Sequence, residues 1–130
     1  MTWCLLLILF AGEEKEESVV PKAFDVCWMV LLKKGAVRDH SEKESALIQT
    51  GHLAHLKRLY NEGKILVAGP LEVDEAHPIR GIVLYSGDLE QATVKHLAES
   101  DPAVKAGRLE VEIMKWWTPK DAISFNKTAY

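Results

Sequence analysis

Residues 52–70 read HLAHLKRLYNEGKILVAGP, and within this stretch the chain changes from a helical to an extended pattern. Gly63 marks the change, because glycine most readily adopts the left-handed conformation in which many helices end. The short apolar run after it closes with Gly69-Pro70, a pair typical of a turn. The stretch therefore predicts a helix that is followed directly by a strand. The apolar residues of the helix share one face, with three-and-four spacing: Leu53, Leu56, Leu59 and Tyr60.

The predicted helix extends back to Ser41. Glu44 follows three residues later, which is the spacing of a capping box at a helix N-terminus. Further upstream, residues 26–32 read VCWMVLL, a run rich in β-branched and aromatic residues that Lys33-Lys34-Gly35 ends. This run predicts a strand buried on both faces, or on one face with a dimer partner covering the other.

Two more strands and a second helix follow. Residues 80–85, RGIVLY, and residues 108–117, RLEVEIMKWW, predict strands, and the second run alternates as a half-buried strand does. Between them we expect a helix capped by Asp88 and ended by Asp101-Pro102, because proline disfavours helical geometry in the residue before it. Four small or apolar residues would lie on its buried side: Leu89, Ala92, Leu97 and Ala98.

The order of predicted elements is strand–helix–strand–strand–helix–strand. This βαββαβ order is that of the ferredoxin-like α+β fold, in which both helices pack on one face of an antiparallel sheet. The other sheet face would be left open. Because an apolar face must be covered, we expect a second copy of the chain to cover it in a homodimer.

Composition limits the function further. The chain has 130 residues, enough for one domain, and a net charge of −3 with lysines scattered among acids, which argues against a nucleic-acid partner. The two cysteines, Cys4 and Cys27, form no disulfide framework and no zinc-ligand spacing. We find no flavin, nicotinamide or haem motif and expect no cofactor.

The N-terminus carries an apolar run, residues 3–11, that is too short to span a bilayer, which takes about 20 residues. The run suits the hydrophobic region of a signal peptide, and the acidic residues 13–17 follow it. We interpret residues 1–20 as a signal peptide and flexible acidic segment, with export of the mature protein and no stable membrane span. The alternative is a short buried segment of a cytoplasmic protein.

His52 is the residue that points most directly to chemistry. It lies at the centre of the apolar helix face, where it is either a core histidine tied to a hydrogen-bond partner or a general acid/base. His55 lies about 60° around the helix from it, and we expect it at the rim or surface. The two could bind a metal with His77 as a third ligand, but no further ligand is evident and we expect no metal.

Other candidate residues lie at the ends of the predicted elements. Asp101 either ends the second helix or aims its carboxylate at His52. Gly69 and Pro70 either form a plain turn or let a ligand approach the backbone. Arg80 and Arg108 begin strands, where they either lie at the surface or hold an anionic group of a substrate.

In four segments the sequence resembles the YCII-related family: HLAHL at residues 52–56, GKILVAGP at residues 63–70, RGI at residues 80–82 and DPAVKAGRLE at residues 101–110, with the Trp116-Trp117 pair after them. The resemblance covers residues 26–117 in order. It implies a domain over residues 24–118, a polar tail over residues 119–130, and a ferredoxin-like fold that pairs into a dimeric α+β barrel. The stretch at residues 33–39 resembles a subgroup with export signals.

The resemblance also implies a cleft that holds a histidine and an aspartate, which here are His52 and Asp101. Relatives often carry an acidic residue before the glycine that ends the first helix, where this chain has Asn61-Glu62. Two functions stay open. The chain is a cofactor-free lyase or isomerase that acts on a small molecule, with Gly69, Pro70 and Arg80 at the substrate, or it is a non-catalytic ligand-binding or structural dimer.

Overall fold

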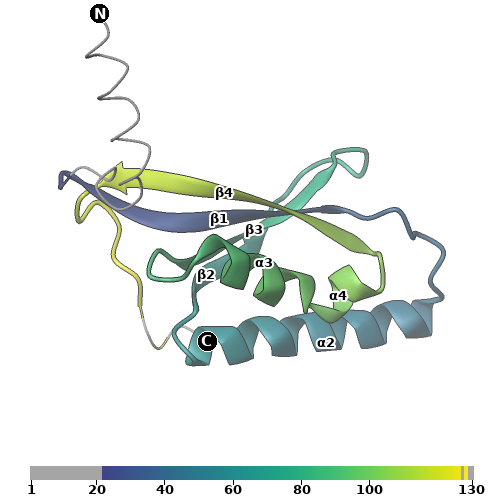
Figure 1. Cartoon of the computed structure of the whole chain (residues 1–130). Helices are drawn as coiled ribbons and strands as arrows, with labels where there is room; N and C mark the ends of the chain where they lie inside the picture. The colour runs from purple at the N-terminus through teal and green to yellow at the C-terminus, as the bar shows by residue number, and fades with distance from the viewer. Residues whose placement is uncertain (1–21, 127, 129–130) are drawn as a thin grey trace, which may run out of the picture.

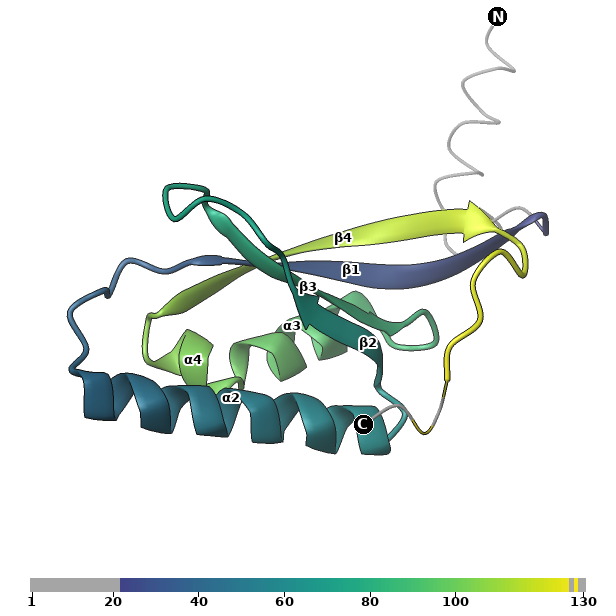
Figure 2. The same cartoon turned by 180° about the vertical axis from the view of Figure 1, so that it is seen from behind.

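The computed structural model describes residues 22–126 and 128, so the interpreted signal segment at residues 1–20 lies outside the described residues. Helices cover one face of a four-stranded antiparallel sheet with the strand order β2-β3-β1-β4 (Figure 1, and Figure 2 from behind). This confirms the predicted βαββαβ order and the α+β class. The strands are β1 (Phe24–Lys34), β2 (Ile65–Pro70), β3 (Ile79–Ser86) and β4 (Leu109–Pro119). The helices are α2 (Glu42–Asn61), α3 (Gln91–Glu99) and the short α4 (Pro102–Lys105).

The strand predicted from residues 26–32 is central in the sheet. β1 pairs with β4 along its whole length, from Phe24 opposite Pro119 to Lys34 opposite Leu109, and with β3 on its other side. The core lies between the sheet and the helices. It is built on side chains with almost no exposed surface: Val30, Leu59, Ile65, Val83, Tyr85 and Val94.

The long helix α2 begins and ends as the sequence predicts. The Ser41 hydroxyl accepts a hydrogen bond from the Glu44 backbone N–H at 3.1 Å, and the Glu44 carboxylate accepts one from the Ser41 N–H at 2.8 Å. At the other end Gly63 has a φ of 77°, and its N–H donates to the Tyr60 carbonyl. The helix therefore stops at a fixed place, and the chain turns directly into β2.

The start of α3 differs from the prediction. Asp88 is not its cap, because the helix begins at Gln91 after Glu90, and Asp88 lies in the preceding turn. The Trp28 indole N–H donates to the Leu89 carbonyl at 2.8 Å, so this carbonyl is held by β1 and does not begin the helix. Of the predicted buried side, Ala98 is buried and Leu89 and Leu97 pack against the core, but Ala92 is exposed and Val94 is buried.

The sheet face opposite the helices carries a row of apolar side chains. Met29 pairs with Leu84 on one side and Met114 on the other, and Leu84 pairs with Val67, so the row crosses all four strands. Met29 is next to the core residue Val30 in β1, and successive side chains of a strand point to opposite faces of the sheet. The row therefore lies on the outer face. Val67 and Met114 are 41% and 37% exposed. No helix among the described residues is long and apolar enough to cross a membrane.

Candidate active site

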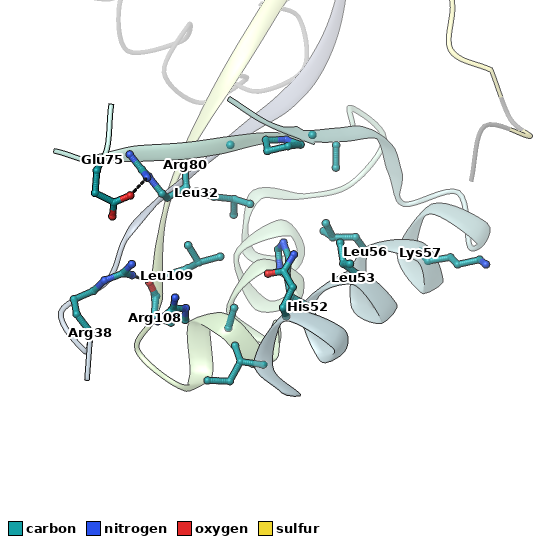
Figure 3. Close-up of a pocket in the computed structure, with 17 residues that line it drawn as sticks. Leu32, Arg38, His52, Leu53, Leu56, Lys57, Glu75, Arg80, Arg108 and Leu109 are labelled. Atoms are coloured by element: carbon teal, nitrogen blue, oxygen red, sulfur yellow. Dashed lines mark hydrogen bonds and ion pairs between the residues drawn. The ribbon is translucent and has the colours of Figure 1, made fainter. Parts of the chain in front are cut away.

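A cleft of about 680 Å³ opens between α2 and the sheet (Figure 3). This volume is within the range of small-molecule sites. Its walls are mainly apolar and come from α2, the neighbouring strand ends and the α4 segment. The lining includes five of the residues that the sequence suggested: His52, Gly69, Pro70, Arg80 and Arg108.

His52 lies in the middle of α2 and is paired with Asp101. The Nδ1 atom of His52 is 2.6 Å from Oδ2 of Asp101, which is 2% exposed. The second carboxylate oxygen of Asp101 accepts the backbone N–H of Ala103 at 2.8 Å. Because a carboxylate only accepts hydrogen bonds, the proton of the neutral imidazole is on Nδ1. The Nε2 atom then carries the free lone pair of a ring that lines the cleft.

The pairing depends on how closely α4 approaches α2. Asp101 is the N-cap of α4 and Pro102 follows it, a combination that starts a helix and fixes the carboxylate. Gly51, next to His52, faces Pro102, and a Cβ at position 51 would lie only 3.2 Å from the proline ring. A glycine at this position therefore lets the two helices meet closely enough to join His52 and Asp101.

His55 is buried, so the prediction of a rim or surface residue was wrong. It is 5% exposed because α3 packs alongside α2, and its Nε2 donates to the Leu97 carbonyl at 3.0 Å. Its Nδ1 accepts a hydrogen bond from the Arg58 guanidinium at 3.2 Å. Burial, and then the neighbouring positive charge of Arg58, lower the pKa of His55, partly offset by the negative charge of Asp101. His55 is thus held as a neutral structural group.

Leu53 also departs from the expected apolar face. Although Leu56, Leu59 and Tyr60 are buried, Leu53 is 55% exposed and lines the cleft. The cleft separates this side of α2 from the sheet, so the apolar face of the helix is shared between the core and the cleft wall. Leu53 therefore contributes to a binding surface and not to the core.

Three arginines converge on one end of the cleft, and Figure 3 shows them apart from Leu56 and Lys57, with His52 in between. Arg80 donates to the carbonyls of Asp74 and His77 at 2.9 and 2.5 Å. Arg38 donates to the Arg108 carbonyl at 2.8 Å. Sequence reasoning missed Arg38, because it lies in the polar loop before α2, where no periodic pattern tells which way a side chain points.

The remaining candidates do not form a metal site. His77 accepts the Ile79 N–H at 3.0 Å in its own loop and does not line the cleft. Within residues 22–126 and 128 there is no group of three His, Cys, Asp or Glu side chains that could hold a metal ion. Gly69 offers only backbone atoms to the cleft, and a Cβ there would meet nothing within 4 Å.

Comparison with known proteins identifies the family of the chain. Residues 27–117 match the family model of the YCII-related domain. Among solved structures, the chain is similar to the 5-chloro-2-hydroxyhydroquinone dehydrochlorinase of Burkholderia phenoliruptrix AC1100 in complex with 2,5-dihydroxybenzoquinone, with 23% identity and a TM-score of 0.48. That similarity covers 68% of this chain and 92% of the other. No curated protein matches the chain.

Proposed function

The chain belongs to the YCII-related domain family, and we propose that it is a cofactor-free enzyme of the lyase or isomerase kind that acts on a small molecule. One observation carries the proposal: the imidazole of His52 lines an open cleft, and its Nδ1 atom is hydrogen-bonded to the buried carboxylate of Asp101. A histidine held only for packing would have its ring sealed by neighbours. Here His52 lines a space large enough for a substrate, and its Nε2 atom is the ring nitrogen that Asp101 does not use.

The chemistry follows from this pair. The Nε2 lone pair of His52 takes a proton from a carbon of the substrate, and the electron pair of the broken C–H bond either expels a leaving group or shifts a double bond. The imidazolium that forms is stabilised by the negative charge of Asp101 at 2.6 Å. In an isomerisation the proton returns to another carbon, and in an elimination it leaves with the departing group or to water.

The alternative is a binding module without catalysis. The low exposure of His52, 8%, and its fully used partner Asp101 are also what a structural hydrogen bond in a core would show. In that case ligands would bind in the cleft unchanged. The two functions differ in one respect, which is whether a bound small molecule exchanges or loses a proton in a manner that depends on His52.

The test uses a panel of small aromatic acids and phenols in D₂O, followed by NMR. Binding appears as shifts of protein signals, and catalysis as loss of a carbon-bound proton signal or appearance of a product. We expect catalysis with the wild type, none with His52→Gln, and full activity with His96→Gln, an exposed histidine on α3. Ligands that bind while no proton is exchanged would reject the enzyme in favour of the binding module.

A homodimer is part of the same proposal. The apolar row of Met29, Leu84, Met114 and Val67 crosses the sheet face that no described helix covers. A contiguous apolar surface of this kind is rarely left in water, and a second copy of the sheet offers a matching one. The family resemblance points to the same partner.

A further inference from the structure

Three of the four Lys and Arg side chains in the cleft lining gather at one end. Leu32, Leu56 and Leu109 make its wall apolar, whereas Arg38, Arg80 and Arg108 gather at one end. The arginines come from three separate parts of the chain: the loop before α2, the start of β3 and the start of β4. The fold thus brings together three cations that the sequence keeps far apart.

The arginine end keeps an excess of positive charge. Among the described residues that line the cleft, Glu75 is the one that carries a carboxylate. Its oxygens lie 3.4 Å from the Lys34 ammonium and 3.9 Å from the Arg80 guanidinium. The hydrogen bond from Lys34, and then the nearby positive charges, lower the pKa of Glu75, so it is ionised. One carboxylate faces four cations, Lys34 and the three arginines, and the charge of Arg38 also acts on it, so this end keeps a net positive charge.

The arginines differ in how far they are already engaged. Arg80 is held by two loop carbonyls and approaches Glu75, so it supports the loop. Arg38 uses one nitrogen on the Arg108 carbonyl. The Arg108 side chain makes no hydrogen bond or ion pair within the described part of the chain. A guanidinium with unused donors in a partly enclosed cleft is suited to a planar oxyanion.

The backbone around this end narrows the choice of anion. Phosphate sites usually add free backbone N–H groups to their cations. Here the N–H groups of Gly35, Val37 and Arg108 already donate to carbonyls, as does that of Gly107. These four N–H groups are therefore not available to an anion, whereas the paired donors of a guanidinium match the two oxygens of a carboxylate.

We infer that Arg108 and Arg38 bind the carboxylate of a small acid whose flat apolar body lies along the leucine wall toward His52. The substrate of the proposed reaction is then an aromatic or unsaturated carboxylic acid, and this last step rests on the proposed function. The reacting position would lie across the apolar middle of the cleft, away from the carboxylate.

The test compares benzoate with benzamide, which has the same ring and shape but no charge, by calorimetric titration of the wild type. We expect benzoate to bind at least about tenfold more tightly at low ionic strength, because hydrogen bonds to charged groups are stronger than neutral ones. Added salt should reduce this difference. Equal affinities would overturn the inference, and tighter binding of phenyl phosphate than of benzoate would overturn the assignment to a carboxylate.

Variants of single cationic residues identify which positive charges bind the carboxylate. We expect Arg108→Gln and Arg38→Gln each to weaken benzoate binding by about tenfold and to leave benzamide unaffected. Lys57→Gln removes a cation from the opposite end of the lining, and Lys95→Gln removes one from the surface of α3, so both should bind benzoate as the wild type does. Loss of benzoate binding in Lys57→Gln with full binding in Arg108→Gln would contradict the inference.

These measurements record binding without turnover, so they separate the two proposals. If benzoate binding depends on Arg108 but no acid is ever converted, the proposed anion site is supported and the proposed enzymatic function is rejected. If His52-dependent conversion is found for an uncharged molecule and benzoate binds no more tightly than benzamide, the enzymatic function is supported and the anion site is rejected.

Discussion

His52 and Asp101 lie 49 positions apart in the sequence, yet their side chains meet at 2.6 Å. The contact joins the middle of α2 to the N-cap residue of α4, whose carboxylate also accepts the Ala103 N–H. Both oxygens of Asp101 are therefore fixed by donors. One residue sets the start of a helix and the proton position on the imidazole that faces the cleft.

Asp101→Asn should reverse that proton position. The amide oxygen can still accept the Ala103 N–H, so the amide nitrogen faces His52 and donates to Nδ1. The imidazole proton then moves to Nε2, which removes the lone pair from the cleft. We expect a folded protein whose His52-dependent activity is about 10²–10⁴-fold lower. Nitrogen–proton correlation spectra of the His52 ring would report the tautomer without any substrate.

The control for this change is Asp88→Asn, which alters an exposed carboxylate in the turn before α3. It should leave both the His52 tautomer and the activity as in the wild type. Retention of the Nδ1 proton in Asp101→Asn would show that the carboxylate does not set the tautomer.

Much of this fold follows from local patterns, as the boundaries of α2 illustrate. The Ser41–Glu44 capping box and Gly63 are short-range signals, and the structure uses each as the sequence predicts. The alternation in β4 likewise places Val111 and Ile113 against the core. These features need no knowledge of what packs where, because they depend only on neighbours in the sequence.

The errors concern side chains whose surroundings come from distant segments. His55 is buried because α3 lies beside α2, and Leu53 is exposed because a cleft separates it from the sheet. Arg38 joins the cleft through a loop that runs beside Gly107 and Arg108, where the Gly35 N–H bonds the Arg108 carbonyl. Helical periodicity gives one face of a helix but does not tell which neighbour that face will meet.

Two leucines of α2 should therefore respond differently to truncation. Leu56 is 9% exposed and belongs to the core, so Leu56→Ala should lower the free energy of unfolding by about 2–5 kcal/mol. Leu53→Ala removes the same atoms from a side chain that is 55% exposed, and its effect should stay within about 0.5 kcal/mol. Urea unfolding curves measure both, and equal losses would mean that Leu53 is a core residue.

The proposed dimer predicts an effect at Met114 that depends on assembly. Met114 belongs to the apolar row on the outer sheet face and is 37% exposed in the single chain. Met114→Glu would bury a charge without a partner in a sheet-to-sheet interface, so we expect sedimentation velocity to show a monomer where the wild type is a dimer. Leu47→Glu, on an exposed side of α2, should remain a dimer. A wild type that is monomeric at every concentration would reject the interface.

His55 should make the stability of the protein depend on pH in a defined direction. Four groups act on its pKa besides burial: Arg58 and His52 lower it, Asp101 and the Leu97 carbonyl raise it, and the net result is a lowered value. As the pH falls below the ordinary histidine pKa of about 6.5, the unfolded chain therefore binds a proton that the folded chain does not. The free energy of unfolding then decreases with falling pH, until the folded chain also becomes protonated.

The variant His55→Gln isolates this contribution, because glutamine can still donate to the Leu97 carbonyl but does not titrate. Between about pH 7.5 and 5, around the ordinary histidine pKa, wild-type stability should fall more steeply than that of the variant, as measured by urea unfolding at each pH. His96→Gln changes an exposed histidine and should keep the wild-type slope. Protonation of His55 at Nδ1 would place a new proton against the Arg58 guanidinium, which now donates there at 3.2 Å. A His55→Gln protein with an unchanged slope would mean that the folded chain accommodates this proton, and that the neutral histidine is not needed to hold α3 against α2.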